Sequence, residues 1–117
     1  MGTFYYLSSC DTCKRIMNGI NFPEGIALVD IKSSPLSGAQ IDALQALSGS
    51  YEALINKRAQ RYKAQNLKEQ NLDEAGFRNL LLEHYTFLKR PVLQVNNKIF
   101  IGNSAANVAA IKAFFSE

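Results

Sequence analysis

The two cysteines of the chain stand together in the motif Cys10-Asp11-Thr12-Cys13, directly after an apolar run at the amino terminus. Residues 4–7, Phe-Tyr-Tyr-Leu, are typical of a short strand, and the apolar spacing from Lys14 onward is typical of a helix. The motif is therefore expected in the turn between that strand and that helix. There, the exposed N–H groups and the positive dipole end of the helix favour a thiolate at the first cysteine.

The spacing of the two cysteines favours reversible redox chemistry. Two intervening residues place them about one helical turn apart, near the Cα separation of roughly 5.5 Å that disulfides prefer. A chance pair is the alternative, and a structural disulfide closing so short a loop would stabilise little. A structural zinc site needs about four ligands, and the chain adds only His84, for which we expect a structural role. We therefore predict no metal and no bound cofactor.

Composition predicts an ordinary globular protein. With 117 residues, of which 47% are hydrophobic and 20% charged, residues 1–117 are expected to form one domain and, by default, a monomer. We find no apolar stretch of membrane-spanning length and no secretion signal, so we expect no membrane association and a cytoplasmic location. The net charge of +3 is too small to indicate direct nucleic-acid binding. Four basic residues cluster within positions 57–63, either as a solvated helix face or as an anion site.

Hydrophobic periodicity predicts the order of elements along the chain. We expect strands at 4–7, 26–29, 92–95 and 98–101, and helices at 14–20, 37–47, 51–55, 73–88 and 105–115, with 59–71 unassigned. Ser37 and Asp73 are expected to cap the helices that they precede. The first two strands should be parallel and the last two an antiparallel hairpin around Asn96-Asn97. This order predicts an α/β architecture, a thioredoxin-like four-stranded mixed sheet flanked by helices. A helical insertion would separate its βαβ and ββα halves.

Several motifs together resemble the ArsC/Spx family. The first strand with Cys10–Cys13 is similar to the active-site turn of the family, and Asn56-Lys57-Arg58 is similar to the segment that carries its first anion-binding arginine. Leu88-Lys89-Arg90-Pro91-Val92 resembles its Arg-Pro-Ile/Val motif, and Gly102 after the hairpin also has a counterpart. The resemblance covers nearly the whole chain.

The resemblance implies a division of roles that the chemistry supports. Cys10 would be the nucleophile and Cys13 the resolving thiol. The guanidinium groups of Arg58 and Arg90 would hold a tetrahedral oxyanion such as arsenate and would share the catalytic role. Pro91 looks like the cis-proline of the family, although a proline that opens a strand is the alternative. The residues expected to bind substrate are Arg58, Arg90, Pro91 and Thr12.

The sequence departs from the family pattern at two places. Glutaredoxin-linked arsenate reductases of the family carry a third arginine after the hairpin, where this chain reads Gly102-Asn103-Ser104-Ala105. Asn103 or Ser104 could donate hydrogen bonds there but no charge. Those reductases also commonly have one cysteine in the turn and use glutathione as the second thiol. The C-x-x-C pair is instead the pattern of Spx regulators, which contact RNA polymerase.

The sequence therefore predicts a thiol oxidoreductase that acts on a small oxyanion or a disulfide. Glutathione with glutaredoxin, or thioredoxin, would restore its thiols. The alternative is a redox-sensing regulator in which a Cys10–Cys13 disulfide alters binding to the RNA polymerase α subunit. A third hypothesis is the glutathione-dependent reduction of a different substrate, which needs the same nucleophile and the same anion site.

Overall fold

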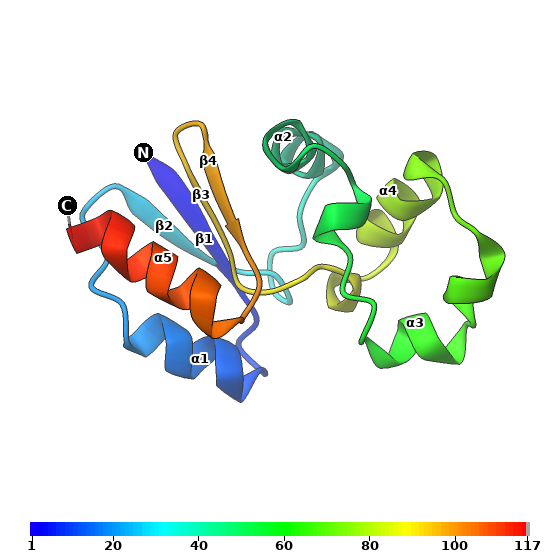
Figure 1. Cartoon of the computed structure of the whole chain (residues 1–117), viewed down its shortest axis with the longest axis horizontal. Coiled ribbons are helices and arrows are strands. Elements are labelled where there is room, and N and C mark those ends of the chain that lie inside the picture. Colours follow the sequence, from blue (N-terminus) through cyan, green and yellow to red (C-terminus); the bar gives the residue numbers. More distant parts are fainter. Residues whose placement is uncertain (117) are drawn as a thin grey trace. The chain divides into compact units, whose positions relative to one another are not determined.

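The computed structural model describes residues 1–116, and the chain divides into two compact units (Figure 1). The first unit is formed by Met1–Ser34 together with the chain from Arg90 onward. The second unit is the intervening segment, Pro35–Lys89. The cysteine motif and the Arg90-Pro91 pair therefore belong to the first unit, whereas Arg58 belongs to the second.

The first unit contains the whole sheet. Its elements are β1 (Gly2–Tyr6), α1 (Asp11–Asn18), β2 (Ile26–Asp30), β3 (Val92–Val95), β4 (Lys98–Ile101) and α5 (Ala105–Ser116). The strand order is β2-β1-β3-β4, with β1 and β2 parallel and the other two pairings antiparallel. This is the predicted thioredoxin-like mixed sheet, and the parallel and antiparallel pairings are both confirmed. β1 begins and ends earlier than predicted, so Leu7 lies beyond the strand, although it is buried.

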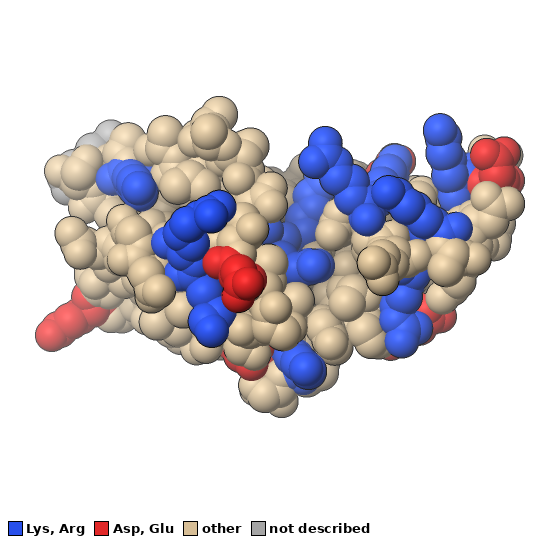
Figure 2. All heavy atoms as spheres, turned by 90° about the horizontal axis from the view of Figure 1, so that it is seen from below, with Lys and Arg blue, Asp and Glu red and all other residues tan. Residues whose placement is uncertain are grey.

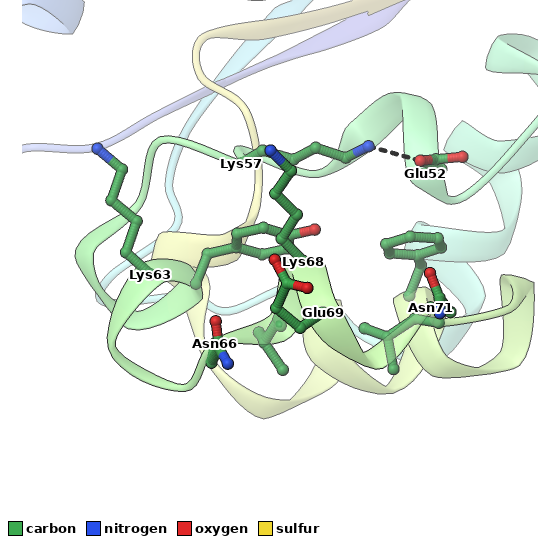
Figure 3. A pocket seen from close by; sticks show the side chains of 11 residues that line it. Glu52, Lys57, Lys63, Asn66, Lys68, Glu69 and Asn71 are labelled. Carbon is green, nitrogen blue, oxygen red and sulfur yellow. Dashed lines mark hydrogen bonds and ion pairs between the residues drawn. The ribbon is translucent and has the colours of Figure 1, made fainter.

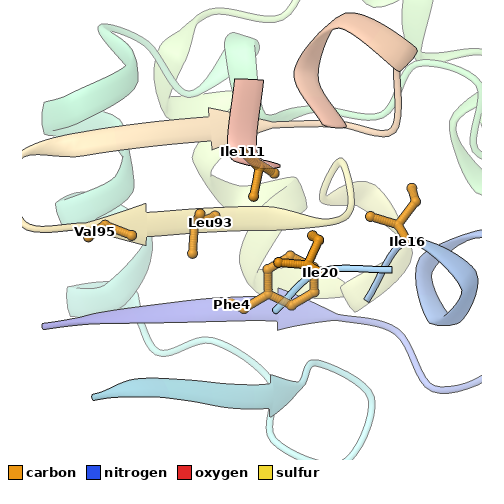
Figure 4. Close-up of a cluster of buried hydrophobic side chains, with 6 residues drawn as sticks. All are labelled: Phe4, Ile16, Ile20, Leu93, Val95 and Ile111. Atoms are coloured by element: carbon orange, nitrogen blue, oxygen red, sulfur yellow. The ribbon is translucent and has the colours of Figure 1, made fainter. Parts of the chain in front are cut away.

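A cluster of buried side chains joins the sheet to its two helices (Figure 4). Phe4 on β1 stands directly opposite Leu93 on β3, and both are fully buried. Because side chains alternate between the faces of a strand, these residues share one face. Helices α1 and α5 cover that face with apolar side chains, which explains why their inward positions are apolar. The cluster consists of Phe4, Ile16, Ile20, Leu93, Val95 and Ile111.

The second unit is helical and forms the predicted insertion between the two halves of the sheet. Its elements are α2 (Gly38–Ser48), η1 (Glu52–Leu54), α3 (Gln60–Ala64), η2 (Leu67–Gln70), α4 (Glu74–Glu83) and η3 (Tyr85–Phe87), where η denotes a 3₁₀ helix. Both predicted caps are present. The Ser37 hydroxyl accepts from the Gln40 N–H (3.2 Å), and the Asp73 carboxylate accepts from the Gly76 N–H (2.9 Å).

Some predicted helix boundaries are wrong. The helix expected to reach Leu88 ends at Glu83, because His84 has an extended backbone and its Nδ1 accepts from the Thr86 N–H to begin η3. Leu88 is instead paired with Ile55 in an isolated β-bridge. The segment 59–71, which had no assignment, holds α3 and η2. Helix α1 begins at Asp11 rather than at Lys14, and this places Cys13 inside the helix.

Candidate active site

Cys10 lies at the junction of a tight turn and helix α1. The N–H of Cys10 donates to the Leu7 carbonyl (3.0 Å), which closes a turn over residues 7–10 directly after β1. The carbonyl of Cys10 then accepts from the Lys14 N–H (3.1 Å), the first hydrogen bond of the helix. Cys10 is thus the N-cap of α1, and its Sγ stands at the positive end of the helix dipole.

The surroundings of Cys10 stabilise its thiolate. Burial alone would raise the pKa of Cys10, but interactions with the Cys13 N–H, the Cys13 thiol and the Arg90 side chain together lower it below the ordinary value. The Cys13 N–H contributes without making a full capping hydrogen bond. Cys10 is only half-buried, so a reactant can reach its sulfur. A low pKa and an accessible sulfur are the requirements of a nucleophilic cysteine.

Cys13 has the opposite environment. It lies in the first turn of α1 with no exposed surface, and both cysteines are free thiols. Burial first, and then the negative charge of Cys10, raise the pKa of Cys13 to about 11. A thiol in this position stays protonated while Cys10 carries charge. The pair therefore contains one sulfur suited to nucleophilic attack, Cys10, and one that remains a protonated thiol, Cys13.

Arg90 and Pro91 approach the cysteines from the start of β3. Arg90 is the cation that acts on Cys10, through both a side-chain hydrogen bond and its charge. The Arg90–Pro91 peptide bond is cis, and the Pro91 side chain is fully buried. The carbonyl of Pro91 accepts from the Gly102 N–H (2.8 Å), which ties the start of β3 to the end of the hairpin. The sequence-predicted pair Cys10 and Arg90 is thus brought together.

Two other predicted site residues have less defined surroundings. Thr12 lies between the cysteines in the first turn of α1 and is half-buried. Arg58 is exposed in the second unit, just before α3, and its N–H donates to the Asn56 side chain (3.1 Å). The roles of Thr12, Pro91 and Arg58 in substrate binding remain predictions.

Comparison with known proteins identifies the family. The model of the ArsC family matches residues 5–111, which is nearly the whole chain. This chain belongs to the ArsC family. A search of curated proteins gives no match. The match includes both the cysteine motif and Arg90, so the resemblance drawn from those residues is confirmed at the level of the family.

Solved structures of ArsC-like proteins share the fold. An arsenate reductase from Vibrio cholerae is 18% identical, with a TM-score of 0.74 over 94% of this chain and 96% of that one. An arsenate reductase (ArsC) related protein from Brucella melitensis is 26% identical, with a TM-score of 0.69 over 93% and 92%. A possible arsenate reductase from Streptococcus mutans is 28% identical, with a TM-score of 0.65 over 85% and 87%.

The segment after the hairpin has a structural role in this ArsC-family chain. The Ser104 hydroxyl accepts from the Asn107 N–H (3.1 Å), and its carbonyl accepts from the Val108 N–H (3.0 Å), so Ser104 begins helix α5. The side-chain amide of Asn107 donates to the Gly102 carbonyl (2.7 Å). Gly102 has a φ of 98°, a left-handed conformation that glycine adopts at little cost. Asn103 is exposed.

The second unit carries a basic surface and a cavity of its own. Lys57, Arg58, Arg61 and Lys63 are all exposed, and basic side chains gather over the right-hand part of the face in Figure 2, which corresponds to the α3 region. A cavity of about 680 Å³ lies within this unit (Figure 3). Lysines and glutamates line it together with apolar side chains, and Lys57 is paired with Glu52. It is lined by Glu52, Lys57, Tyr62, Lys63, Asn66, Leu67, Lys68, Glu69, Asn71, Leu72 and Phe77.

Sequence reasoning missed Asp30, the last residue of β2. Its carboxylate accepts hydrogen bonds from the turn that precedes Cys10 and from the turn that follows β2. An aspartate that ends a strand and is followed by a serine-rich stretch is a recognisable turn signal. The contact between Asp30 and Ser8, which are 22 residues apart, cannot be recognised from the sequence, because it depends on the pairing of β1 with β2.

Two features are absent from the described residues, a cluster of metal ligands and a membrane-spanning helix. Among residues 1–116, no group of three or more His, Cys, Asp or Glu side chains is placed to hold a metal ion. Within the same residues, every helix is too short or too polar to cross a membrane.

Proposed function

We propose that this protein is an arsenate reductase-like thiol oxidoreductase in which Cys10 is the nucleophile. The observation that carries the proposal is the position of Cys10, a half-exposed N-cap cysteine with a lowered pKa beside the Arg90 guanidinium. That arrangement offers a thiolate and a fixed cation to the same small anion. Membership of the ArsC family supports the same class of reaction.

In the first step, the Cys10 thiolate attacks the arsenic atom of arsenate. A sulfur–arsenic bond forms, one arsenate oxygen leaves as hydroxide, and a proton from solvent converts that hydroxide to water. The planar donor fork of Arg90 hydrogen-bonds the oxyanion and offsets its negative charge as it approaches the thiolate. We also propose that Arg58, Thr12 and Pro91 take part in substrate binding.

In the second step, Cys13 attacks the sulfur of Cys10. A Cys10–Cys13 disulfide forms, and the sulfur–arsenic electron pair stays on arsenic, which is reduced from As(V) to As(III) while the two thiols are oxidised. The first step prepares the second. The negative charge of the Cys10 thiolate is one cause of the raised pKa of Cys13, and formation of the adduct removes that thiolate while Arg90 offsets the charge of the bound oxyanion.

A reductant outside the chain must then reopen the disulfide. We propose glutathione with glutaredoxin, or thioredoxin, each of which supplies two thiol electrons through a mixed disulfide. No resident cofactor is required by this scheme. The same nucleophile and cation would also serve a disulfide or another small oxyanion as substrate.

The test is a count of free thiols over time after reduced protein is mixed with arsenate, with and without glutathione. We expect arsenate-dependent loss of both thiols, a mass decrease of two hydrogens, and release of arsenite. Cys10→Ser should abolish all three. Cys13→Ser should instead accumulate a Cys10 adduct that glutathione releases. Full reductase activity in Cys10→Ser would refute the mechanism.

A second candidate function is a redox switch that binds RNA polymerase. Two observations favour it, namely the free C-x-x-C pair with one buried thiol and the absence of an arginine in residues 102–105. This candidate would be supported by thiols that do not react with arsenate but rapidly form a disulfide when diamide is added. A binding assay of reduced and oxidised protein against the polymerase α subunit would then decide it, and binding by neither form would exclude it.

A further inference from the structure

The carboxylate of Asp30 joins two turns at one end of the sheet. Its Oδ1 accepts from the backbone N–H groups of Ser8 (3.1 Å) and Lys32 (3.2 Å), and its Oδ2 accepts from the Ser33 hydroxyl (3.2 Å). The Ser8 hydroxyl first, together with the N–H groups of Ser8 and Lys32, holds the pKa of Asp30 below its ordinary value. Asp30 is therefore ionised at neutral pH.

The backbone around Asp30 is itself fixed. Asp30 pairs with Tyr6 at the ends of the parallel strands β2 and β1. The next residue, Ile31, is fully buried, and its N–H donates to the Tyr6 carbonyl (2.9 Å). The Asp30 side chain therefore projects from a rigid position toward the chain that leaves β1.

Ser8 occupies the corner of the turn that ends at Cys10. The turn over residues 7–10 is closed by the hydrogen bond from the Cys10 N–H to the Leu7 carbonyl. Ser8 and Ser9 are both exposed, so packing does little to hold this corner. The Asp30 carboxylate, at the end of β2, supplies a fixed hydrogen-bond acceptor for the Ser8 N–H.

We propose that Asp30 is a positioning residue that holds the Ser8 corner and thereby sets the place of the Cys10 sulfur relative to α1 and Arg90. The inference rests on the proposed role of Cys10 as nucleophile. A reactive group keeps a precise position only when hydrogen bonds and packing hold the residues around it. Asp30 would provide that support without touching the substrate.

The negative charge of Asp30 does not account for the support that we propose it gives to Cys10. A negative charge close to a thiol disfavours the thiolate, and Asp30 is not among the groups that act on Cys10. The groups that favour the Cys10 thiolate are the Cys13 N–H and thiol on α1 and the Arg90 side chain before β3. The contribution of Asp30 is therefore geometric, and this distinguishes it from the contribution of Arg90.

The test compares Asp30→Ala with Asp30→Asn by the rate at which iodoacetamide alkylates Cys10 across pH, with the site assigned by peptide mass spectrometry. Asparagine retains an oxygen acceptor for the Ser8 N–H but lacks the charge, whereas alanine lacks both. We expect Asp30→Ala to slow alkylation at neutral pH by about fivefold, the net scale of one lost hydrogen bond, and to move the midpoint to higher pH. Asp30→Asn should stay within about twofold of the wild type.

Ser33→Ala is the matched control. It removes the hydroxyl bound to Oδ2 and leaves the Ser8 and Lys32 contacts intact, so alkylation should be unchanged. Equal slowing by Asp30→Asn and Asp30→Ala would overturn the proposal, because the charge rather than the acceptor would then matter. A wild-type rate and midpoint in folded Asp30→Ala would also overturn it.

A measurement on the wild-type protein covers the case in which Asp30→Ala does not fold. Exchange of the Ser8 amide hydrogen, followed by NMR, should be slowed relative to an unstructured chain, although Ser8 is exposed. Free exchange at Ser8 would overturn the proposal. Because alkylation and exchange need no substrate, these outcomes are distinguishable from failure of the arsenate assay, which concerns the proposed function alone.

Discussion

At the scale of single residues, the proposed chemistry depends on two identical side chains with opposite environments. Cys10 and Cys13 are one helical turn apart, yet the pKa of the first is lowered and the pKa of the second is raised to about 11. Position in the helix contributes to the difference, since the N-cap Cys10 is half-buried beside the Cys13 N–H whereas Cys13, in the first turn, is fully buried. The position of the C-x-x-C motif at a strand–helix junction and the neighbouring Arg90 side chain both contribute to this asymmetry.

The first prediction concerns the pH dependence of Cys10. The thiolate is present above the pKa of Cys10 and is lost as the pH falls through it, so alkylation should reach half its maximal rate below the ordinary thiol pKa. Arg90→Ala removes a cation that lowers this pKa. The midpoint should therefore move to higher pH, and the rate at neutral pH should fall by about fivefold.

Lys89→Ala is the control for this prediction, because it removes a neighbouring exposed cation that is not among the groups acting on Cys10. Its alkylation profile should match the wild type. An unshifted midpoint in Arg90→Ala would show that Arg90 does not stabilise the thiolate.

At the scale of elements, local signals in the sequence were sufficient where a capping side chain or a turn-forming asparagine sets the boundary. Ser37 and Asp73 are capping residues with an acceptor oxygen, and the structure places a helix after each. The Asn96-Asn97 turn was equally readable, because asparagine adopts the left-handed conformation observed at Asn96, where φ is 53°.

Boundaries set by distant partners could not be predicted. The periodicity of Phe77, Leu80 and Leu81 continues to Leu88, but Leu88 pairs with Ile55 in a β-bridge and therefore does not belong to the helix. The same limit applies to the site. Cys10, Cys13 and Arg90 lie in motifs that resemble those of the family. Asp30 instead contacts Ser8, and that contact exists only once β1 and β2 pair.

The second prediction concerns the capping box that begins α2. The Ser37 hydroxyl accepts from the Gln40 N–H, and the Gln40 side chain accepts from the Ser37 N–H (2.8 Å). Ser37→Ala should lower the free energy of unfolding by about 1 kcal/mol, measured by urea denaturation followed by circular dichroism. Ser34→Ala, at an exposed serine before the helix, should leave it unchanged. Equal stability in the two variants would mean that the cap contributes nothing.

At the scale of the whole molecule, the proposed chemistry is divided between two units. The first unit holds the nucleophile, the buried thiol and Arg90, and its sheet and core fix them in place. The second unit carries Arg58 within a basic, exposed segment. The function proposed here therefore assigns activation of sulfur to one unit and a share of anion binding to the other.

The third prediction follows from this division and separates Arg58 from Arg90. If Arg58 binds the oxyanion, Arg58→Ala should raise the KM for arsenate by about tenfold, the scale of one charge-assisted hydrogen bond, while the pH midpoint for alkylation of Cys10 stays at the wild-type value. Arg90→Ala should change both quantities, because Arg90 acts on the thiolate directly. Arg61→Ala removes an exposed arginine from the same basic segment and serves as the matched control, with an expected KM close to the wild type. Equal increases in KM for Arg58→Ala and Arg61→Ala would assign anion attraction to the general charge of the second unit rather than to Arg58.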